Sequence, residues 1–197
     1  GASGSGPDGN PGVANSAIFQ GHAGGDGYTA GSVYGAGGGG GAGEKGGDGW
    51  SLQAGDGGNG LSFVTSSKRK TYAGGGGGSA WRTDQLNQQG KGGAGGGGPG
   101  GFYNANPGLA GFPGFEHNSN NGLTNRGGGG GGGQHGPGDN LASGANGGSG
   151  VVILRGPYAA TFTFSAGVTV TNDPVGSDTV YIITATSSTS ETVTITE

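Results

Sequence analysis

The sequence predicts a bundle of polyglycine-II helices with protruding loops over residues 1–150, followed by a small all-β unit over residues 151–197 that serves attachment or oligomerisation. Three observations predict this fold class. The chain has 58 glycines in 197 residues, many of these glycines recur at a spacing of three, and the glycine-poor end alternates apolar and polar residues. Only 28% of the residues are hydrophobic, which is too few for an ordinary core. We therefore expect backbone contacts to hold the larger region together.

The spacing of three is the basis for the helix prediction. A polyproline-II-type helix has three residues per turn and a rise of about 3.1 Å, and its N–H and C=O groups need partners on other chains. Such helices can stack side by side if every contacting face is glycine, and about eight to ten short ones are expected over residues 1–150. The triplet series are Gly6, Gly9 and Gly12; Gly21, Gly24 and Gly27; Gly43, Gly46 and Gly49; Gly92, Gly95, Gly98 and Gly101; Gly108, Gly111 and Gly114; and Gly144, Gly147 and Gly150.

Uninterrupted glycine runs occupy residues 37–41, 74–78 and 127–133. A helix enclosed on every side needs glycine at nearly every position, so we expect these runs to be the enclosed ones. Ordering each residue costs on the order of 1–2 kcal/mol of backbone entropy, which cooperative backbone hydrogen bonding has to offset. Collagen is disfavoured because the triplets stop and restart out of phase, whereas a β-sheet with glycine bulges stays open as an alternative.

Stretches with fewer glycines and more aromatic and polar residues separate the glycine segments. We interpret them as loops that join one helix to the next, so alternate loops lie at the same end of the bundle. Loops 61–72 and 102–126 share an end if two single helices separate them, unless the glycine triplet 108–114 forms an extra helix. The loop stretches are residues 13–20, 28–34, 61–72, 79–89, 102–126 and 134–143.

The C-terminal region has the pattern of β-strands. Phe162 and Phe164 alternate with threonines, as do Val168 and Val170, which is typical of half-buried strands. With a turn at 172–178, the region holds about four or five strands. These strands are too few to be very stable alone, so we expect them to pack on the glycine region or on neighbouring subunits.

The residues give little support for catalysis, and we predict that the protein is not an enzyme and binds no cofactor or metal. The chain has no cysteine and no G-x-S-x-G nucleophile motif, and its histidines, His22, His117 and His135, are far apart. Aspartates beside glycines are typical of calcium repeat loops, but the nonapeptide repeat is missing. Those aspartates are Asp26, Asp48, Asp56 and Asp139.

Charge and hydropathy exclude several partners. The net charge is −4 and only 10% of residues are charged, so no strong field attracts nucleic acid. No apolar run approaches the roughly 18 residues of a membrane span, and we expect no membrane insertion. The given sequence shows no leader pattern and no initial methionine, so we expect a processed or trimmed product. Residues 66–72 form the only basic cluster, which we interpret as a solvated loop tip or, less favoured, a contact for an anionic surface group.

Large rings, Trp50 among them, are unexpected in a glycine slab, because it offers no deep core. Some would cap the ends of the bundle, and the others would be exposed anchors, since rigid rings bind at low entropic cost. Together with nearby cations they give the candidate receptor-binding residues. These are Phe63, Lys68, Arg69, Lys70, Tyr72, Trp81, Arg82, Phe102, Tyr103, Phe112, Phe115 and His117.

Glycine runs that alternate with aromatic and polar segments resemble the distal tail-fibre adhesins of T-even-type bacteriophages, in which a polyglycine-II sandwich displays receptor-binding loops. Separately, GGSGVVILR at 147–155 is similar to the closing strand of a glycine-rich domain common in phage tail and virion proteins. The resemblance implies an extracellular or virion location and recognition of a bacterial surface protein or glycan by loops 61–72, 79–89 and 102–126. The chain departs from the adhesins in lacking an evident N-terminal attachment module and in carrying a β region after the glycine domain.

The leading hypothesis is therefore a phage tail-fibre or virion surface protein for host attachment, either a homo-oligomer or joined to other subunits of an oligomeric fibre. A second hypothesis is a self-assembling fibre or capsid-decoration subunit whose Thr/Val strands complete a neighbour's sheet. A third is an ice-binding protein with a flat, regular face, against which the long aromatic loops argue.

Overall fold

The computed structural model describes residues 21–30, 33–65, 68–81, 88–103, 116–117, 119–133 and 143–196. The chain divides into two compact units. The glycine unit comprises Gly1–Leu61 and Thr71–Ser149, and the β unit comprises Ser62–Lys70 and Gly150–Glu197. Each unit is described separately below.

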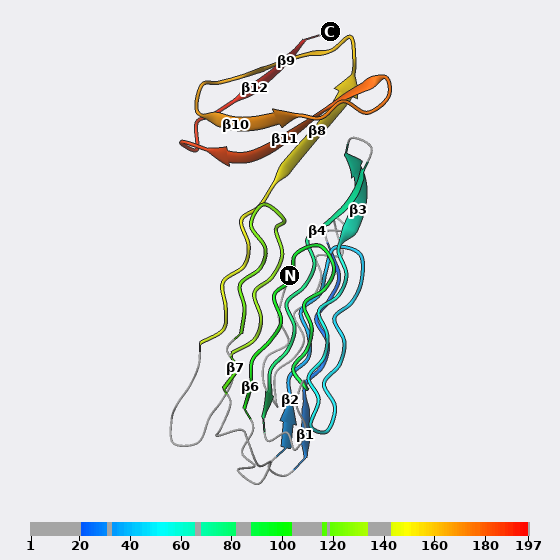
Figure 1. Cartoon of the computed structure of the whole chain (residues 1–197), viewed down its shortest axis with the longest axis vertical. Coiled ribbons are helices and arrows are strands. Elements are labelled where there is room, and N and C mark those ends of the chain that lie inside the picture. Colours follow the sequence, from blue (N-terminus) through cyan, green and yellow to red (C-terminus); the bar gives the residue numbers. More distant parts are fainter. Residues whose placement is uncertain are drawn as a thin grey trace. The chain divides into compact units, whose positions relative to one another are not determined.

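The predicted polyglycine-II helix bundle is wrong as a fold class. The described residues contain no helix, and their regular elements are strands in four small sheets, so this part of the chain is all-β. The glycine segments between the strands are extended lengths of chain that lie side by side (Figure 1). The spacing of three is found instead in hydrogen bonds between segments: the N–H groups of Ala36 and Gly39 donate to the carbonyl oxygens of Ser79 and Gly76. The period that suggested helices therefore specifies contacts between neighbouring segments.

The uninterrupted glycine runs differ in how enclosed they are. Residues 37–41 and 74–78 are buried at every position, as expected, whereas most of 127–133 is only partly buried. Run 74–78 exchanges backbone hydrogen bonds with five other segments, at residue 39, residues 55–58, residues 90–95, residue 98 and residues 129–132. A Cβ atom added at Gly75 would overlap the carbonyl oxygen of Gly39. Glycine is therefore required in these runs because the segments touch through their backbones.

A five-stranded sheet closes one end of the glycine unit (Figure 1). Its strand order is β1-β2-β5-β6-β7, and every pair is antiparallel except β5 and β6, which are parallel. A small apolar cluster of Ala54, Ala80 and Phe102 accompanies it. The strands are β1 (Tyr28–Ala30), β2 (Val33–Gly35), β5 (Ala80–Trp81), β6 (Phe102–Tyr103) and β7 (Glu116–His117).

The predicted loop 61–72 is a β-hairpin of β3 (Leu61–Thr65) and β4 (Lys68–Tyr72). The chain leaves the glycine unit at Leu61 and re-enters it at Thr71, at the end opposite β6 and β7 (Figure 1). The prediction that loops 61–72 and 102–126 begin from a shared end is therefore wrong. The reason is a turn at 94–96, where Gly95 and Gly96 have φ values of 103° and 100°, a region that favours glycine. This turn makes three segments, not two, between the hairpin and β6.

The C-terminal part of the β unit has the five strands that the alternating pattern predicted, and all their pairings are antiparallel. One sheet has the order β10-β11-β8 and the other pairs β12 with β9. The rings of Phe162 and Phe164 lie 4.8 and 5.0 Å from that of Tyr181, and Val180 is buried. The strands are β8 (Val152–Pro157), β9 (Thr161–Phe164), β10 (Val168–Asn172), β11 (Asp178–Thr186) and β12 (Val193–Thr196).

Candidate functional site

The five-stranded sheet brings together several positions that the sequence singled out. Trp81 is the Cα partner of Tyr103 on one side and of Tyr34 on the other. Tyr103 in turn pairs with Glu116, and Phe102 pairs with His117. Segment 104–115 therefore begins and ends at paired positions of this sheet, and segment 82–87 begins one strand away.

Two of the candidate rings have a structural role. Phe102 is fully buried against Ala54 and Ala80, so it offers no surface to a receptor. Tyr72 is also buried, and the guanidinium carbon of Arg126 lies 5.1 Å from the centre of its ring. The Arg126 Nη1 group donates a hydrogen bond of 2.8 Å to the carbonyl oxygen of Thr71. These rings stabilise the two ends of the glycine unit.

The β3–β4 hairpin presents the other described candidates. Leu61, Phe63 and Val64 of β3 are each about half exposed, and because alternate residues point to opposite faces, both faces of the strand are open to solvent. Lys68 and Arg69 are exposed, and Lys70 is half-buried. None of these three cations makes an ion pair with a described residue. The hairpin thus combines apolar and cationic groups.

The remaining candidates lie wholly or partly outside the described residues. Arg82, Phe112 and Phe115 fall in undescribed segments, and Trp81, Tyr103 and His117 are described only as backbone positions.

Two exposed rings are not among the candidate receptor-binding residues: Trp50, one of the large rings expected to cap the bundle or serve as an anchor, and Tyr158, which the sequence did not single out. Trp50 is 66% exposed in the turn where it pairs with Gln53, and Tyr158 is 83% exposed between β8 and β9. The signal for Trp50 was its position between two glycine segments, in the stretch GDGWSLQAGDG. Both rings have surface to offer a partner.

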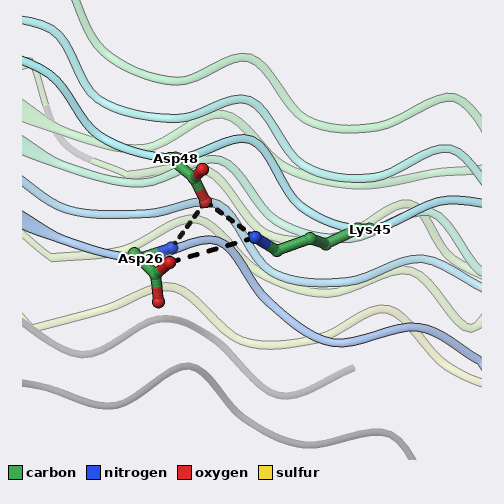
Figure 2. Close-up of polar contacts among 3 residues, drawn as sticks. All are labelled: Asp26, Lys45 and Asp48. Carbon is green, nitrogen blue, oxygen red and sulfur yellow. Dashed lines mark hydrogen bonds and ion pairs between the residues drawn. The ribbon is translucent and has the colours of Figure 1, made fainter.

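Side-chain oxygens satisfy N–H groups on the outside of the glycine unit. Figure 2 shows Asp48, whose Oδ1 accepts hydrogen bonds from Asp26 N at 2.8 Å and Lys45 Nζ at 3.0 Å. The backbone N–H of Asp26, followed by the ammonium group of Lys45, lowers the pKa of Asp48 below its ordinary value. The hydrogen bond to Asp48 raises the pKa of Lys45. Lys45 Nζ also lies 4.0 Å from Asp26 Oδ2.

The same arrangement recurs along the glycine unit. Asp56 accepts from the N–H of Lys91 at 2.7 Å, Asn59 from that of Ala94 at 2.8 Å, and Asn121 from that of Asn146 at 2.9 Å. In each case a side chain supplies the acceptor that a further glycine segment would supply in the interior.

This role accounts for Asp48 and Asp56, two of the aspartates that resemble calcium ligands, whereas the Asp26 carboxylate lies near Lys45. Within the described segments, no group of three or more His, Cys, Asp or Glu side chains could hold a metal ion. Asp139 lies outside the described residues.

Comparisons with known proteins add no relative: no protein-family model, curated protein or solved structure matches the chain. Nowhere in the described part does a helix occur that is long and apolar enough to cross a membrane. The likeness to phage adhesins therefore stays a prediction from the sequence.

Proposed function

We propose that this protein is a non-enzymatic phage tail-fibre or virion surface protein, located outside the host cell, that binds a bacterial surface protein or glycan. The single observation that carries the proposal is the five-stranded sheet. It holds both ends of segment 104–115 and the start of segment 82–87 on adjacent strands. These segments contain the candidate residues Arg82, Phe112 and Phe115.

The bonding of the glycine unit supports a role for this unit as a scaffold and for the connecting segments as the receptor-binding part. Its segments are joined by backbone hydrogen bonds, so its stability depends little on which side chains the connecting segments carry. Recognition residues are commonly placed on loops that a rigid scaffold positions. A scaffold held in this way tolerates new loop sequences, which suits a protein that must follow a changing receptor.

The candidate residues are divided between two surfaces. Trp81, Tyr103 and His117 belong to the sheet, whereas Phe63, Lys68 and Arg69 belong to the β3–β4 hairpin. We assign primary receptor contact to the sheet end, because aromatic side chains are typical anchors of protein and glycan binding. The hairpin is then a second contact suited to an anionic group.

The test compares two variants of the full chain in binding to intact cells of candidate hosts. In the first variant a short Gly-Ser linker replaces 104–115, and in the second, a matched control, Lys68, Arg69 and Lys70 become glutamine. We expect the linker variant to lose selective binding while its thermal unfolding is unchanged. The glutamine variant should keep selectivity and lose only part of the affinity. Selective binding that survives the linker, or wild-type protein that binds no plausible host, would refute the proposal.

A second candidate function is self-assembly into a fibre or capsid decoration. β8 and β12 are edge strands, and apolar side chains remain exposed on them: Val152 (54%), Val193 (36%) and Ile195 (53%). Exposed apolar edge strands are prone to pair with other strands. If this function is correct, changing Val193 and Ile195 to lysine will abolish concentration-dependent oligomers in sedimentation experiments. Ice binding stays a third hypothesis, which a thermal hysteresis measurement tests directly.

A further inference from the structure

Three Asn-Gly pairs occur in the chain, and all lie in the described part of the glycine unit. They are Asn59-Gly60, Asn121-Gly122 and Asn146-Gly147, and all three asparagines are exposed. An asparagine followed by glycine is chemically labile, because the next backbone nitrogen can attack the side-chain amide carbon without hindrance from a side chain. The attack requires a nitrogen free to lose its proton and a side chain free to approach it to about 3–3.5 Å.

In the Asn59 pair, hydrogen bonds restrain both the side-chain amide and the attacking backbone nitrogen. Asn59 Oδ1 accepts from Ala94 N at 2.8 Å, and Asn59 Nδ2 donates to Glu44 Oε2 at 2.7 Å. The attacking atom, Gly60 N, donates to the Ala94 carbonyl oxygen at 2.8 Å. Three hydrogen bonds must therefore break before the reaction can begin.

The Asn121 pair is locked by a single neighbour. Asn121 Oδ1 accepts from Asn146 N at 2.9 Å, and Gly122 N donates to the carbonyl oxygen of the same residue at 2.9 Å. Gly122 is also buried.

The Asn146 pair lacks these restraints. Asn146 uses its backbone to lock Asn121, but its own side chain forms no hydrogen bond with any described residue, and neither does Gly147 N. Gly147 is exposed, and a Cβ atom added there would find only the Gly128 carbonyl oxygen within 4 Å, at 3.3 Å. The exposed Asn146 side chain is accordingly free to turn toward the Gly147 nitrogen.

We propose that Asn146-Gly147 is a site of selective spontaneous deamidation, with water as the co-reactant, and that the fold protects the other two pairs. Base removes the proton from Gly147 N, the N–Cγ bond forms and the Cγ–Nδ2 bond breaks. The departing NH2 group takes up one proton, which balances the one removed from Gly147 N, and leaves as ammonia. One water molecule then opens the cyclic imide at either carbonyl, which gives aspartate or isoaspartate at position 146.

The isoaspartate product alters the last glycine segment. It routes the main chain through the former side chain, which adds one methylene between residue 146 and Gly147. Beyond that point Gly148 N donates to Gly128 O at 2.8 Å, and Ser149 O accepts from Arg126 N and Gly127 N. A longer path shifts these groups out of register, so the modification loosens the final segment before β8.

The experiment incubates the full chain in mildly alkaline buffer and follows each pair by peptide mapping with mass spectrometry. An isoaspartyl methyltransferase assay identifies the isomerised product. Because each locked pair must break two or three hydrogen bonds, deamidation at Asn146 should be faster than at Asn59 and Asn121 by roughly tenfold or more. In guanidinium chloride the three rates should converge, because the local sequences are alike.

Matched variants test whether the fast reaction occurs at Asn146 and whether hydrogen bonds protect Asn59. Gly147→Ala should abolish the fast reaction, and Asn146→Gln should remove it without changing charge. Glu44→Ala should accelerate the reaction at Asn59 alone, because it removes one of the three locking bonds. Similar rates at the three sites in the folded chain, or a faster rate at Asn59 or Asn121, would overturn the proposal.

Discussion

The two units of this chain are held together by different parts of the polypeptide. In the glycine unit, buried backbone meets buried backbone, and the apolar cluster consists of Ala54, Ala80 and Phe102. In the β unit, side chains such as Phe162 and Tyr181 pack across strands in the ordinary way. The difference shows that glycine can specify a fold by marking the positions where backbone contacts leave no space for a side chain. A side chain added inside the glycine unit collides with backbone, whereas a side chain removed from the β unit leaves a void.

The largest expected effect comes from adding a methyl group inside the glycine unit. In Gly75→Ala the new Cβ overlaps the carbonyl oxygen of Gly39, and backbone cannot move aside as a flexible side chain can. We expect the free energy of unfolding to fall by at least about 3 kcal/mol, measured by calorimetry. The control is Gly144→Ala, where the nearest atom would lie 3.5 Å away and the cost should stay within about 0.5 kcal/mol. Equal effects would show that close approach does not decide where glycine is needed.

A ring deletion comes next in size. Phe102→Ala removes a fully buried ring and should cost about 3 kcal/mol or more, whereas Phe63→Ala removes a half-exposed ring and should cost under about 1 kcal/mol. Calorimetry of the full chain measures both losses. The fluorescence of Trp50 and Trp81 in chemical denaturation reports the Phe102 loss separately, because these tryptophans and Phe102 belong to the glycine unit whereas Phe63 belongs to the β unit. A small loss for Phe102→Ala would mean that backbone bonding alone holds this end.

The outer hydrogen bonds should contribute less. Asp56→Ala deprives the N–H of Lys91 of its acceptor, but water can replace it at this exposed position, so we expect a loss of about 0.5–1 kcal/mol. Asp56→Asn keeps an acceptor oxygen and should recover most of the stability. If the alanine and asparagine variants unfold alike, the carboxylate acts through its charge and not as a hydrogen-bond acceptor.

The sequence predicted the strands of the β unit well, because alternating apolar residues such as Phe162 and Phe164 report directly which face is buried. It failed on the glycine unit for a physical reason. A spacing of three states which residues touch a neighbour, but glycine allows many backbone conformations, so the spacing did not establish a helix. Nor did any residue type mark the turn at Gly95 and Gly96 inside a glycine-rich stretch.

The candidate site was only partly predictable for a related reason. Phe63 and Phe102 both lie beside glycine segments, yet one is half exposed and the other fully buried. What separates them is the contact of Phe102 with Ala54 and Ala80, which are distant in sequence. Whether a ring is buried is decided by which segments become its neighbours, and the sequence does not state that order.

Mild acid should destabilise the β unit more than the glycine unit, and this difference is the smallest effect of the series. Glu191 accepts hydrogen bonds from the hydroxyl groups of Ser165, Ser187 and Ser188, and the first two, Ser165 foremost, are the main cause that lowers its pKa below the ordinary 4.5. A lowered pKa in the folded state means that the stabilisation is complete above about pH 4.5 and is lost as the pH falls through the lower folded-state value. Because Ser165 follows β9 and Ser187 follows β11, protonation loosens the link between the two sheets of the C-terminal region.

The glycine unit should respond less to the same acid, because backbone hydrogen bonds do not titrate. Its Asp48 loses its bond to the N–H of Asp26 only as the pH falls below the ordinary value of 3.8. Methyl signals of Val180 in NMR spectra should therefore shift as acid protonates Glu191, whereas the fluorescence of the two tryptophans should change less. Glu191→Gln should move the Val180 transition and leave the fluorescence transition in place. Coincident transitions in the wild type, or a shift of both in the variant, would show that the two units unfold as one and that their different construction has no separate thermodynamic consequence.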